Sequence, residues 1–175
     1  MAVLDILTYP DPLLKKKSEA VVDLDADTLS FIANLEETLY HYPGCVGVAA
    51  PQTGTLKRII VIDVSRNRKP VENHGKLILI NPVIEEQTGD EIAREGCLSL
   101  PDFTANVKRS KNIRCRAMTP AGAELVIDAE GFEARVILHE IDHLDGLLFL
   151  DRVSSLKTDV FRRKRFAVPE TVQPD

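Results

Sequence analysis

The sequence predicts an α+β fold in which antiparallel β-sheets surround a central helix, with a further helix near each end of the chain. Three observations support this class. Residues 136–144 have the pattern of a helix and carry two histidines four positions apart. Residues 112–118 and 124–128 have the pattern of a β-hairpin. No strand–helix–strand alternation is visible, which favours antiparallel over parallel pairing.

The composition is that of a globular chain with one sizeable core. Of the 175 residues, 44% are hydrophobic and 28% are charged, and the net charge is −5. We predict a single domain over residues 1–166. Residues 167–175 contain two prolines and no apolar periodicity, which predicts a disordered tail. The acidic balance argues against binding of free DNA through a broad basic surface.

Several features favour a cytoplasmic location. No apolar stretch of about 18 residues is present, so we expect no membrane span. The first residues lack a basic region followed by an apolar run, and Asp5 and Asp11 argue against an organellar presequence. The three cysteines form an odd, sparse set, which favours reduced thiols over a disulfide framework.

The N-terminal part is expected to hold an arm and a helix. Residues 1–22 carry prolines and a lysine run and are predicted to form an extended arm that wraps the body. Residues 25–42 predict the first helix, because Asp25 or Asp27 can cap it and apolar residues recur at helical spacing. The pair Pro43-Gly44 ends this helix.

Small residues and two strands follow. Residues 45–52 are small and apolar and end in a glutamine. Small residues allow a peptide backbone to approach closely, but tight packing gives the same composition and is favoured by the pattern alone. Residues 58–64 predict a buried strand, residues 65–75 a loop and residues 76–85 a second strand broken at Asn81-Pro82.

The C-terminal part is expected to contain the central helix. Residues 95–101 predict a short extended segment that precedes the hairpin, whose two strands are joined by a turn at residues 119–122. Gly131 begins the central helix and Gly146 ends it. Residues 155–165 predict a last helix with a basic end.

The central helix contains the sequence His-Glu-x-x-His. On a helix, residues four apart lie on one face about 5–6 Å apart, so His139 and His143 can bind one metal ion. Glu140 then lies beside the metal, where a carboxylate that is not a ligand can take a proton from water and return it to a leaving amine. The spacing therefore predicts metal-assisted hydrolysis.

A catalytic tetrahedral site needs a third protein ligand. The longer motif His-Glu-x-x-His-x-x-Gly-x-x-His fails at its last position, because Phe149 cannot bind a metal. The next glutamate after the motif, Glu170, lies in the predicted tail and is not favoured. The remaining candidates lie upstream and carry nitrogen or sulfur donors: His41, His74, Cys45, Cys97 and Cys115.

Local features favour Cys97 only modestly. Cys115 alternates inside a predicted strand, as a core residue does, and His41 and His74 lie where solvent is expected. Cys97 follows Gly96 in an extended segment, which lets a thiolate point into a cleft. The other donors remain open at this point.

Three blocks together resemble the peptide deformylase family. Residues 45–52 (Cys-Val-Gly-Val-Ala-Ala-Pro-Gln) are similar to the family's Gly-x-Gly-x-Ala-Ala-x-Gln. Residues 95–99 match Glu-Gly-Cys-Leu-Ser, and residues 139–143 match His-Glu-x-Asp-His. Residues 6–14 are similar to the family's opening, so the likeness covers roughly residues 4–165.

This resemblance implies roles for individual residues. The metal ligands would be Cys97, His139 and His143, and Glu140 would be the general base and acid. The side-chain amide of Gln52 and the backbone N–H of Leu98 would hold the developing oxyanion. The resemblance implies Fe²⁺ as the physiological metal, which zinc, nickel or cobalt replaces in isolated protein, whereas the ligand types alone suggest zinc.

The resemblance also implies the substrate. The enzyme would remove the formyl group from N-formylmethionyl nascent peptides and release formate. The peptide would pair as an added strand with Val46, Gly47 and Gly96. Val46, Val136 and Phe132 would form the apolar pocket for the methionine side chain. The family's terminal helix further implies ribosome binding through the basic end of the last helix.

Two residues depart from the family pattern. Cys45 replaces the first glycine of its block, which leaves the loop geometry at the cleft entrance open and places a second thiol near the site. Thr104 stands where many bacterial relatives carry an arginine, so no carboxylate-binding role is assigned to it.

Two other functions compete with this prediction. One is a different amidase or peptidase that uses the same helix. A comparison of the turnover of formylated and acetylated peptides would separate the two functions. The other is a non-catalytic domain in which the metal only holds the fold together. The presence of Gln52, Glu140 and three ligands argues against that loss of activity.

Overall fold

The computed structural model describes residues 1–163, which form an α+β fold. Within these residues the α-helices are α1 (Ala26–His41) and α2 (Gly131–Leu144), and neither has the length and apolar character needed to cross a membrane. The strands are β1 (Gly47–Ala49), β2 (Ile59–Asp63), β3 (Lys76–Cys97), β4 (Leu100–Met118), β5 (Glu124–Glu130) and β6 (Val160–Arg162). Short 3-10 helices cover Pro12–Lys15, Ala50–Thr53, Val64–Arg66 and Phe149–Asp151.

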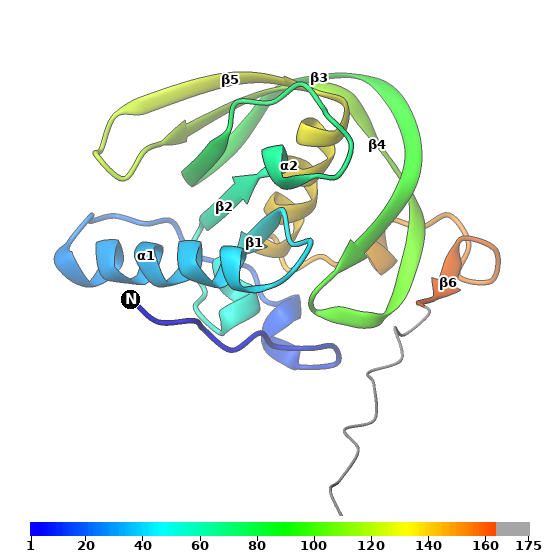
Figure 1. The fold of residues 1–175 in the computed structure, drawn as a ribbon, viewed down its shortest axis with the longest axis horizontal. Helices are drawn as coiled ribbons and strands as arrows, with labels where there is room; N and C mark the ends of the chain where they lie inside the picture. The colour runs from blue at the N-terminus through cyan, green and yellow to red at the C-terminus, as the bar shows by residue number, and fades with distance from the viewer. Residues whose placement is uncertain (164–175) are drawn as a thin grey trace, which may run out of the picture.

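The strands form one sheet in the order β1-β2-β3-β4-β5, with β6 paired to β4. All of these pairings are antiparallel. The sheet curls, and α2 lies inside the curve that the long strands β3 and β4 make (Figure 1). The predicted fold class, antiparallel strands around a central helix, is therefore confirmed.

Strand β2 is buried on both faces, which explains its continuous apolar sequence. Ile60 and Ile62 belong to the core cluster that contains Ile137 of α2. The alternate residues Ile59 and Val61 belong to the cluster that contains the apolar face of α1. Because successive side chains of a strand point to opposite faces, β2 separates the two helices and holds α2 on one side of the sheet.

Helix α1 begins where the sequence predicts. The Asp25 side chain accepts a hydrogen bond from the Thr28 backbone N–H at 2.8 Å, which caps the helix. The chain leaves the helix through Gly44, whose φ of 73° is in the left-handed region that glycine favours. Leu35 and Leu39 are fully buried and bind the helix to the sheet.

Strands β3 and β4 form a hairpin much longer than predicted. The sequence indicated separate extended segments at residues 76–85 and 95–101, but β3 continues through both. Residues 85–92 are exposed, so the alternation of apolar and polar residues that marks a half-buried strand is absent there. A change of register between Gly96 and Cys97 marks the point where β3 ends.

The N-terminal arm wraps the body as predicted and reaches the neighbourhood of Cys97. The backbone N–H of Leu7 donates to the Gln52 carbonyl at 2.7 Å, and that of Tyr9 donates to the Ser99 carbonyl at 2.8 Å. Leu14 is fully buried. The arm therefore supports the two loops that carry Gln52 and Ser99.

The predicted C-terminal helix is wrong over the described residues. Residues 155–159 form turns, and Val160–Arg162 form strand β6 on β4. Three ladder pairs and the burial of Val160 against the cluster of Leu148 and Phe149 outweigh the helical preference of the sequence. The predicted tail at residues 167–175 and the end of the basic run at residues 164–165 lie outside the described residues.

Candidate active site

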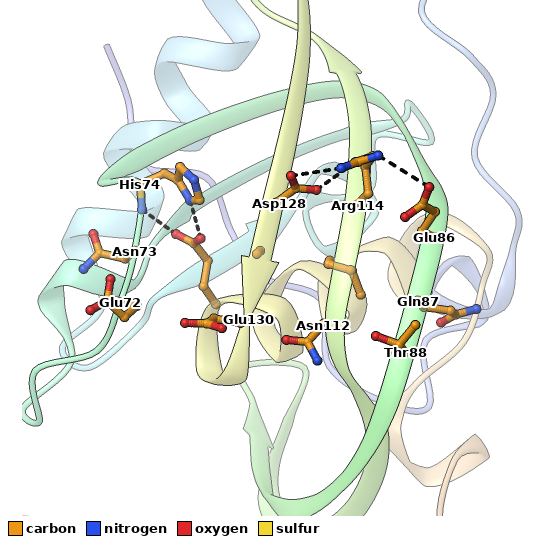
Figure 2. Close-up of a pocket in the computed structure, with 13 residues that line it drawn as sticks. Glu72, Asn73, His74, Glu86, Gln87, Thr88, Asn112, Arg114, Asp128 and Glu130 are labelled. Carbon is orange, nitrogen blue, oxygen red and sulfur yellow. Dashed lines mark hydrogen bonds and ion pairs between the residues drawn. The ribbon is translucent and has the colours of Figure 1, made fainter.

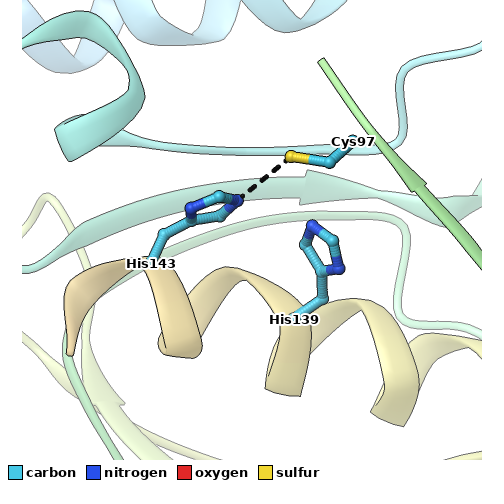
Figure 3. Close-up of side chains that lie close together, drawn as sticks. All are labelled: Cys97, His139 and His143. Carbon is cyan, nitrogen blue, oxygen red and sulfur yellow. Dashed lines mark hydrogen bonds between the residues drawn. The ribbon is translucent and has the colours of Figure 1, made fainter. Parts of the chain in front are cut away.

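Three side chains that could hold a metal ion converge beside α2. The donor atoms of Cys97, His139 and His143 all lie within 4.8 Å of one another, and the three residues are buried. The Sγ atom of Cys97 is 3.3 Å from Nε2 of His143. Both histidines extend from successive turns of α2 toward the cysteine at the end of β3 (Figure 3). The structure thus brings together the three ligands that the family resemblance implies.

Glu95 fixes the orientation of His139. Its carboxylate is 2.7 Å from Nδ1 of His139 and accepts hydrogen bonds from Arg109 at 2.6 and 2.9 Å and from Arg135 at 2.7 Å. Burial acts to raise the pKa of Glu95, but the hydrogen bonds from His139 and Arg109 outweigh it and lower this pKa to about 2. The ionised carboxylate holds the proton on Nδ1, which leaves Nε2 of His139 as the donor for a metal.

Asp142 links α2 to the sheet and to the loop after the helix. Its carboxylate accepts hydrogen bonds from Arg109 at 2.8 Å and from Arg152 at 2.8 and 3.1 Å. Arg109 therefore joins Asp142 to Glu95 through a buried network of charges. This network fixes how far α2 can turn or slide against β4, and with it the position of both histidines.

Glu140 is buried opposite Gly47. A Cβ atom added to Gly47 would lie 2.8 Å from Oε1 of Glu140, so only glycine leaves room for the carboxylate. Oε2 of Glu140 has no hydrogen-bond partner among the described residues. Burial raises the pKa of Glu140 to about 7, although the nearby charges of His139 and Arg109 act to lower it. A carboxylate with that pKa can both accept and release a proton near neutral pH.

Gln52 presents its amide group to Cys97. Its Oε1 atom accepts a hydrogen bond from the Ala49 backbone N–H at 2.9 Å, which fixes the side chain. Its Nε2 atom donates to Ser99 Oγ at 3.1 Å and lies 3.5 Å from Cys97 Sγ. Gln52 is buried and lies in the 3-10 helix Ala50–Thr53.

A cavity of about 260 Å³ opens onto these groups. Its lining includes the catalytic candidates Gln52, Leu98 and Glu140 together with Cys97 and His139. All the residues that sequence analysis assigned to substrate binding also line it, namely Val46, Gly47, Gly96, Val136 and Phe132. The cavity is therefore the space in which a substrate would meet the candidate residues.

The other candidate ligands lie apart from this cluster or are already paired. His41 is exposed at the end of α1, and His74 pairs with Glu133. Cys115 is fully buried in the core between the sheet and α2. Cys45 lines the cavity, but burial, followed by the charge of Glu140, raises its pKa to about 12, so its thiol stays protonated and unreactive at neutral pH.

A larger cavity of about 430 Å³ lies elsewhere, over β3, β4 and β5. Most of its charged side chains pair with one another: Glu133 accepts from His74, and Arg114 donates to Asp128 and Glu86 (Figure 2). Among the described residues, the group of side chains that could hold a metal ion lies at the other cavity. We therefore assign the chemistry to the smaller cavity.

Sequence reasoning assigned no role to Glu95, Arg109, Arg135 or Asp142. Glu95 and Asp142 belong to the blocks that match the family, and Arg109 and Arg135 belong to no motif. Four charged side chains that are this deeply buried must pair, but the pairs that they form with one another join residues 14 to 40 positions apart in the chain. The signal in the sequence that could have identified these residues is the presence of charged residues within segments whose other residues belong to the core.

The residues present fit a divalent metal ion. A thiol and two imidazoles with converging donors form a set that suits zinc or a neighbouring transition metal. Nε2 of His139 is oriented by a carboxylate on the other ring nitrogen, as is usual for metal-binding histidines. Nδ1 of His143, by contrast, has no partner among the described residues.

Comparisons with known proteins agree with this geometry. The family model for polypeptide deformylase matches residues 3–159. The peptide deformylase of Thermodesulfovibrio yellowstonii is 44% identical over 164 residues, which cover 94% of this chain and 97% of that protein. The peptide deformylase of Halothermothrix orenii is 46% identical over 153 residues, which cover 87% and 95%.

Solved structures agree as well. The crystal structure of peptide deformylase from Thermotoga maritima has a TM-score of 0.80 and 37% identity, covering 89% of this chain and all of that one. The Ehrlichia chaffeensis enzyme in complex with actinonin has a TM-score of 0.83 and 36% identity, covering 90% and 92%. The family match spans nearly the whole described chain, including every candidate catalytic and metal-binding residue. The chain therefore belongs to the polypeptide deformylase family.

Proposed function

We propose that this protein removes the formyl group from the N-terminal methionine of newly synthesised polypeptides and releases formate. The observation that carries the proposal is the convergence of Cys97, His139 and His143 beside the buried Glu140 carboxylate and the Gln52 amide. Membership of an enzyme family named for this reaction supports it. A metallohydrolase with this set of groups is equipped for hydrolysis of an amide bond.

Cys97, His139 and His143 would hold one metal ion. When bound, the ion supplies Lewis-acid activation of water and of the formyl oxygen. We propose Fe²⁺ as the physiological metal because of the family resemblance, with zinc, nickel or cobalt as substitutes, although the ligand types alone favour zinc. The metal content and the activity of anaerobically purified protein test this choice. Full activity with zinc and none with iron would contradict it.

Glu140 moves the proton in the proposed reaction. Its carboxylate takes a proton from the attacking water while the water oxygen bonds to the formyl carbon. It then gives the proton to the methionine nitrogen as the carbon–nitrogen bond breaks. Formate and a free amino terminus result. The pKa of about 7 suits a group that must act as base and then as acid in each cycle.

Gln52 and Leu98 stabilise the charge that develops on the formyl oxygen. The amide Nε2 of Gln52 is held beside Cys97 by its bonds to Ala49 and Ser99, which supports a role as a preorganised donor. Leu98 lines the same cavity, and its backbone N–H is proposed as the second donor. Removal of one such donor typically costs about 10²–10³ in rate.

The peptide is proposed to lie extended between β1 and the end of β3. Backbone groups of Val46, Gly47 and Gly96 would pair with it, a mode that recognises main chain rather than sequence. This suits an enzyme that acts on many different nascent chains. Val136 and Phe132 line the apolar wall of the cavity and would contact the methionine side chain.

We place the enzyme in the cytoplasm, where nascent peptides emerge. Association with the ribosome through a C-terminal helix is not supported over residues 155–163, which are not helical. We therefore propose ribosome binding through the basic run at residues 162–165 without assigning it a helix. To test this, a chain that ends at Arg163 is compared with the full chain for co-sedimentation with ribosomes. Unchanged co-sedimentation would contradict a role for the removed residues.

The direct test of the function is formate release. Iron-loaded, oxygen-protected protein is expected to release formate from formyl-Met-Ala-Ser and to leave acetyl-Met-Ala-Ser intact. Equal turnover of both peptides would indicate a general amidase instead. Absence of turnover, with the metal bound, would indicate a non-catalytic domain.

A further inference from the structure

Strand β6 carries Arg163 to the rim of the active-site cavity. Thr104 and Phe103 of β4 pair with Phe161 and Arg162 of β6. The backbone N–H of Arg163 donates to the Asp102 carbonyl at 2.7 Å. The main chain of Arg163 is thus held by the edge of the sheet, which leaves its long side chain to extend along the surface toward β3.

A second contact fixes β6 in this place. The guanidinium of Arg94 lies 3.7 Å from the ring centroid of Phe161, a cation–π contact. The same guanidinium donates to Asn106 Oδ1 at 3.1 Å and to Thr104 Oγ1 at 3.3 Å. Through these contacts Arg94 attaches β6 to the hairpin.

The guanidinium of Arg163 lies directly over Gly96. A Cβ atom added to Gly96 would be 2.3 Å from a terminal nitrogen of Arg163, so the glycine leaves the space that the guanidinium fills. Arg163 lines the same cavity as Cys97, Glu140 and Gln52. The Arg163 side chain therefore lies against Gly96, the residue that precedes the proposed metal ligand Cys97. Gly96 is also part of the strand edge with which the peptide is proposed to pair.

Arg163 differs from the buried arginines Arg109 and Arg135 in its electrostatic surroundings, and from Arg94 in that its guanidinium has no side-chain partner among the described residues. Arg109 and Arg135 are buried and paired with Glu95. Within residues 1–163, no carboxylate lies within ion-pair distance of the Arg163 guanidinium, and the residue is exposed. A guanidinium presents parallel N–H donors that match a carboxylate, so this group is ready to bind one.

We propose that Arg163 binds a carboxylate of the peptide substrate, downstream of the formylated methionine, and so gives the enzyme a preference for acidic peptides. The proposal rests on the proposed function, because it requires a formylated peptide in the cavity. The carboxylate has two possible sources: an acidic side chain of the second or third residue, or the free C-terminus of a short peptide.

Peptide pairs separate these sources. Formyl-Met-Asp-Ala amide and formyl-Met-Ala-Asp amide are compared with their Asn counterparts, and formyl-Met-Ala-Asn is compared as free acid and as amide. The parent is expected to favour at least one carboxylate peptide by about 3- to 5-fold in kcat/KM, as for a partly exposed charge pair. The preferred pair identifies the source. The preference should shrink when salt is raised to about 0.5 M, because ions screen exposed charges.

Three variants test whether Arg163 is responsible. Arg163→Gln is expected to bring the ratio of carboxylate to neutral peptide close to one, and Arg163→Lys to retain part of it. Arg162→Gln is the matched control, because Arg162 is its neighbour on β6 and does not line the cavity. This control should keep the parent ratio.

Two results would overturn the proposal. One is a parent enzyme without preference in any pair. The other is a ratio in Arg163→Gln equal to that of the parent, including the case in which the variant hydrolyses all peptides faster by one factor. Turnover of the neutral peptides shows that the proposed function holds even when the preference is absent. If no formylated peptide is hydrolysed, the proposed function and this inference fail together.

Discussion

Gly47 on β1 faces Glu140 on α2 so closely that a Cβ atom on Gly47 would lie 2.8 Å from Oε1 of the carboxylate. The same atom would lie 2.9 Å from Cγ1 of Val136. The backbone of β1 is thus one wall of the space around the Glu140 carboxylate. The position of this carboxylate depends on the absence of a side chain at residue 47, and the proposed reaction requires it to reach the attacking water.

We therefore expect Gly47→Ala to displace Glu140. A misplacement of a catalytic group by about 1 Å can cost about 10²-fold in rate, so kcat/KM for formyl-Met-Ala-Ser should fall by about that factor. Circular dichroism and metal content, measured on the same sample, show whether the fold and the metal site are kept. A folded, metal-loaded variant with parent activity would contradict the close approach.

Glu95→Gln tests the buried charge network. The substitution removes the charge that Arg109 and Arg135 share, and breaking a buried pair in this way typically costs about 3–5 kcal/mol in the free energy of unfolding. Glu86→Gln is the matched control. Glu86 is an exposed partner of Arg114, so its loss should cost about 0–1 kcal/mol. Equal losses in urea unfolding of the two metal-free variants would contradict the network's role.

The same Glu95→Gln variant should bind metal more weakly. Loss of a partner that orients a metal-binding histidine typically lowers affinity by about 10–100-fold. Competition with a chromophoric chelator measures the affinity for Zn²⁺ in parent, Glu95→Gln and Glu86→Gln. Unchanged affinity in Glu95→Gln would show that His139 does not need Glu95 to present Nε2.

Asp63 predicts a dependence of stability on pH. Burial acts to raise its pKa, but hydrogen bonds from Ser65 and Tyr40 outweigh this and hold the pKa below the ordinary value of an aspartate. A group with a lowered folded pKa adds stability above its unfolded pKa of about 3.9 and loses it as pH falls through the folded value.

Asp63→Asn should therefore be less stable than the parent at neutral pH, by an amount that stays constant down to about pH 5. The difference should narrow below about pH 4, as the parent loses the contribution of the carboxylate. Urea unfolding of both proteins between pH 7 and the acid limit of folding measures the difference. A difference that widens toward acid pH would contradict the assignment.

Local chemistry allowed much of the fold to be predicted. The cap at Asp25, the apolar run of β2 and the two histidines of α2 are signals that lie within a few residues of each other. The arm was also predicted correctly, since its prolines and lysines do not suit a core element. Each of these segments forms the structure that its own sequence favours.

Long-range contacts account for what was missed. Residues 85–92 of β3 are exposed, so no periodicity marked them, and only pairing with β4 makes them a strand. Residues 160–162 were expected to be helical but pair with β4 instead, since that edge was free to accept a strand. The partners of Glu95 could not be deduced, because they come from β4 and from α2.

The site illustrates the same limit. The spacing of His139 and His143 predicts their common face, but the choice of Cys97 over four other upstream donors depended on family resemblance. The structure brings Cys97 to the two histidines by ending β3 above α2. The roles of Gln52, Leu98 and the substrate-binding residues stay predictions until activity is measured.

Formate release by Glu140→Ala tests the central claim most directly. Parent and variant are loaded with Fe²⁺ without oxygen, their metal content is determined, and both are given formyl-Met-Ala-Ser. The account predicts equal metal content, because Glu140 is not a ligand, and a loss of turnover of at least about 10²–10⁴-fold, as expected for removal of a general base. A metal-loaded variant that releases formate at the parent rate would contradict the account.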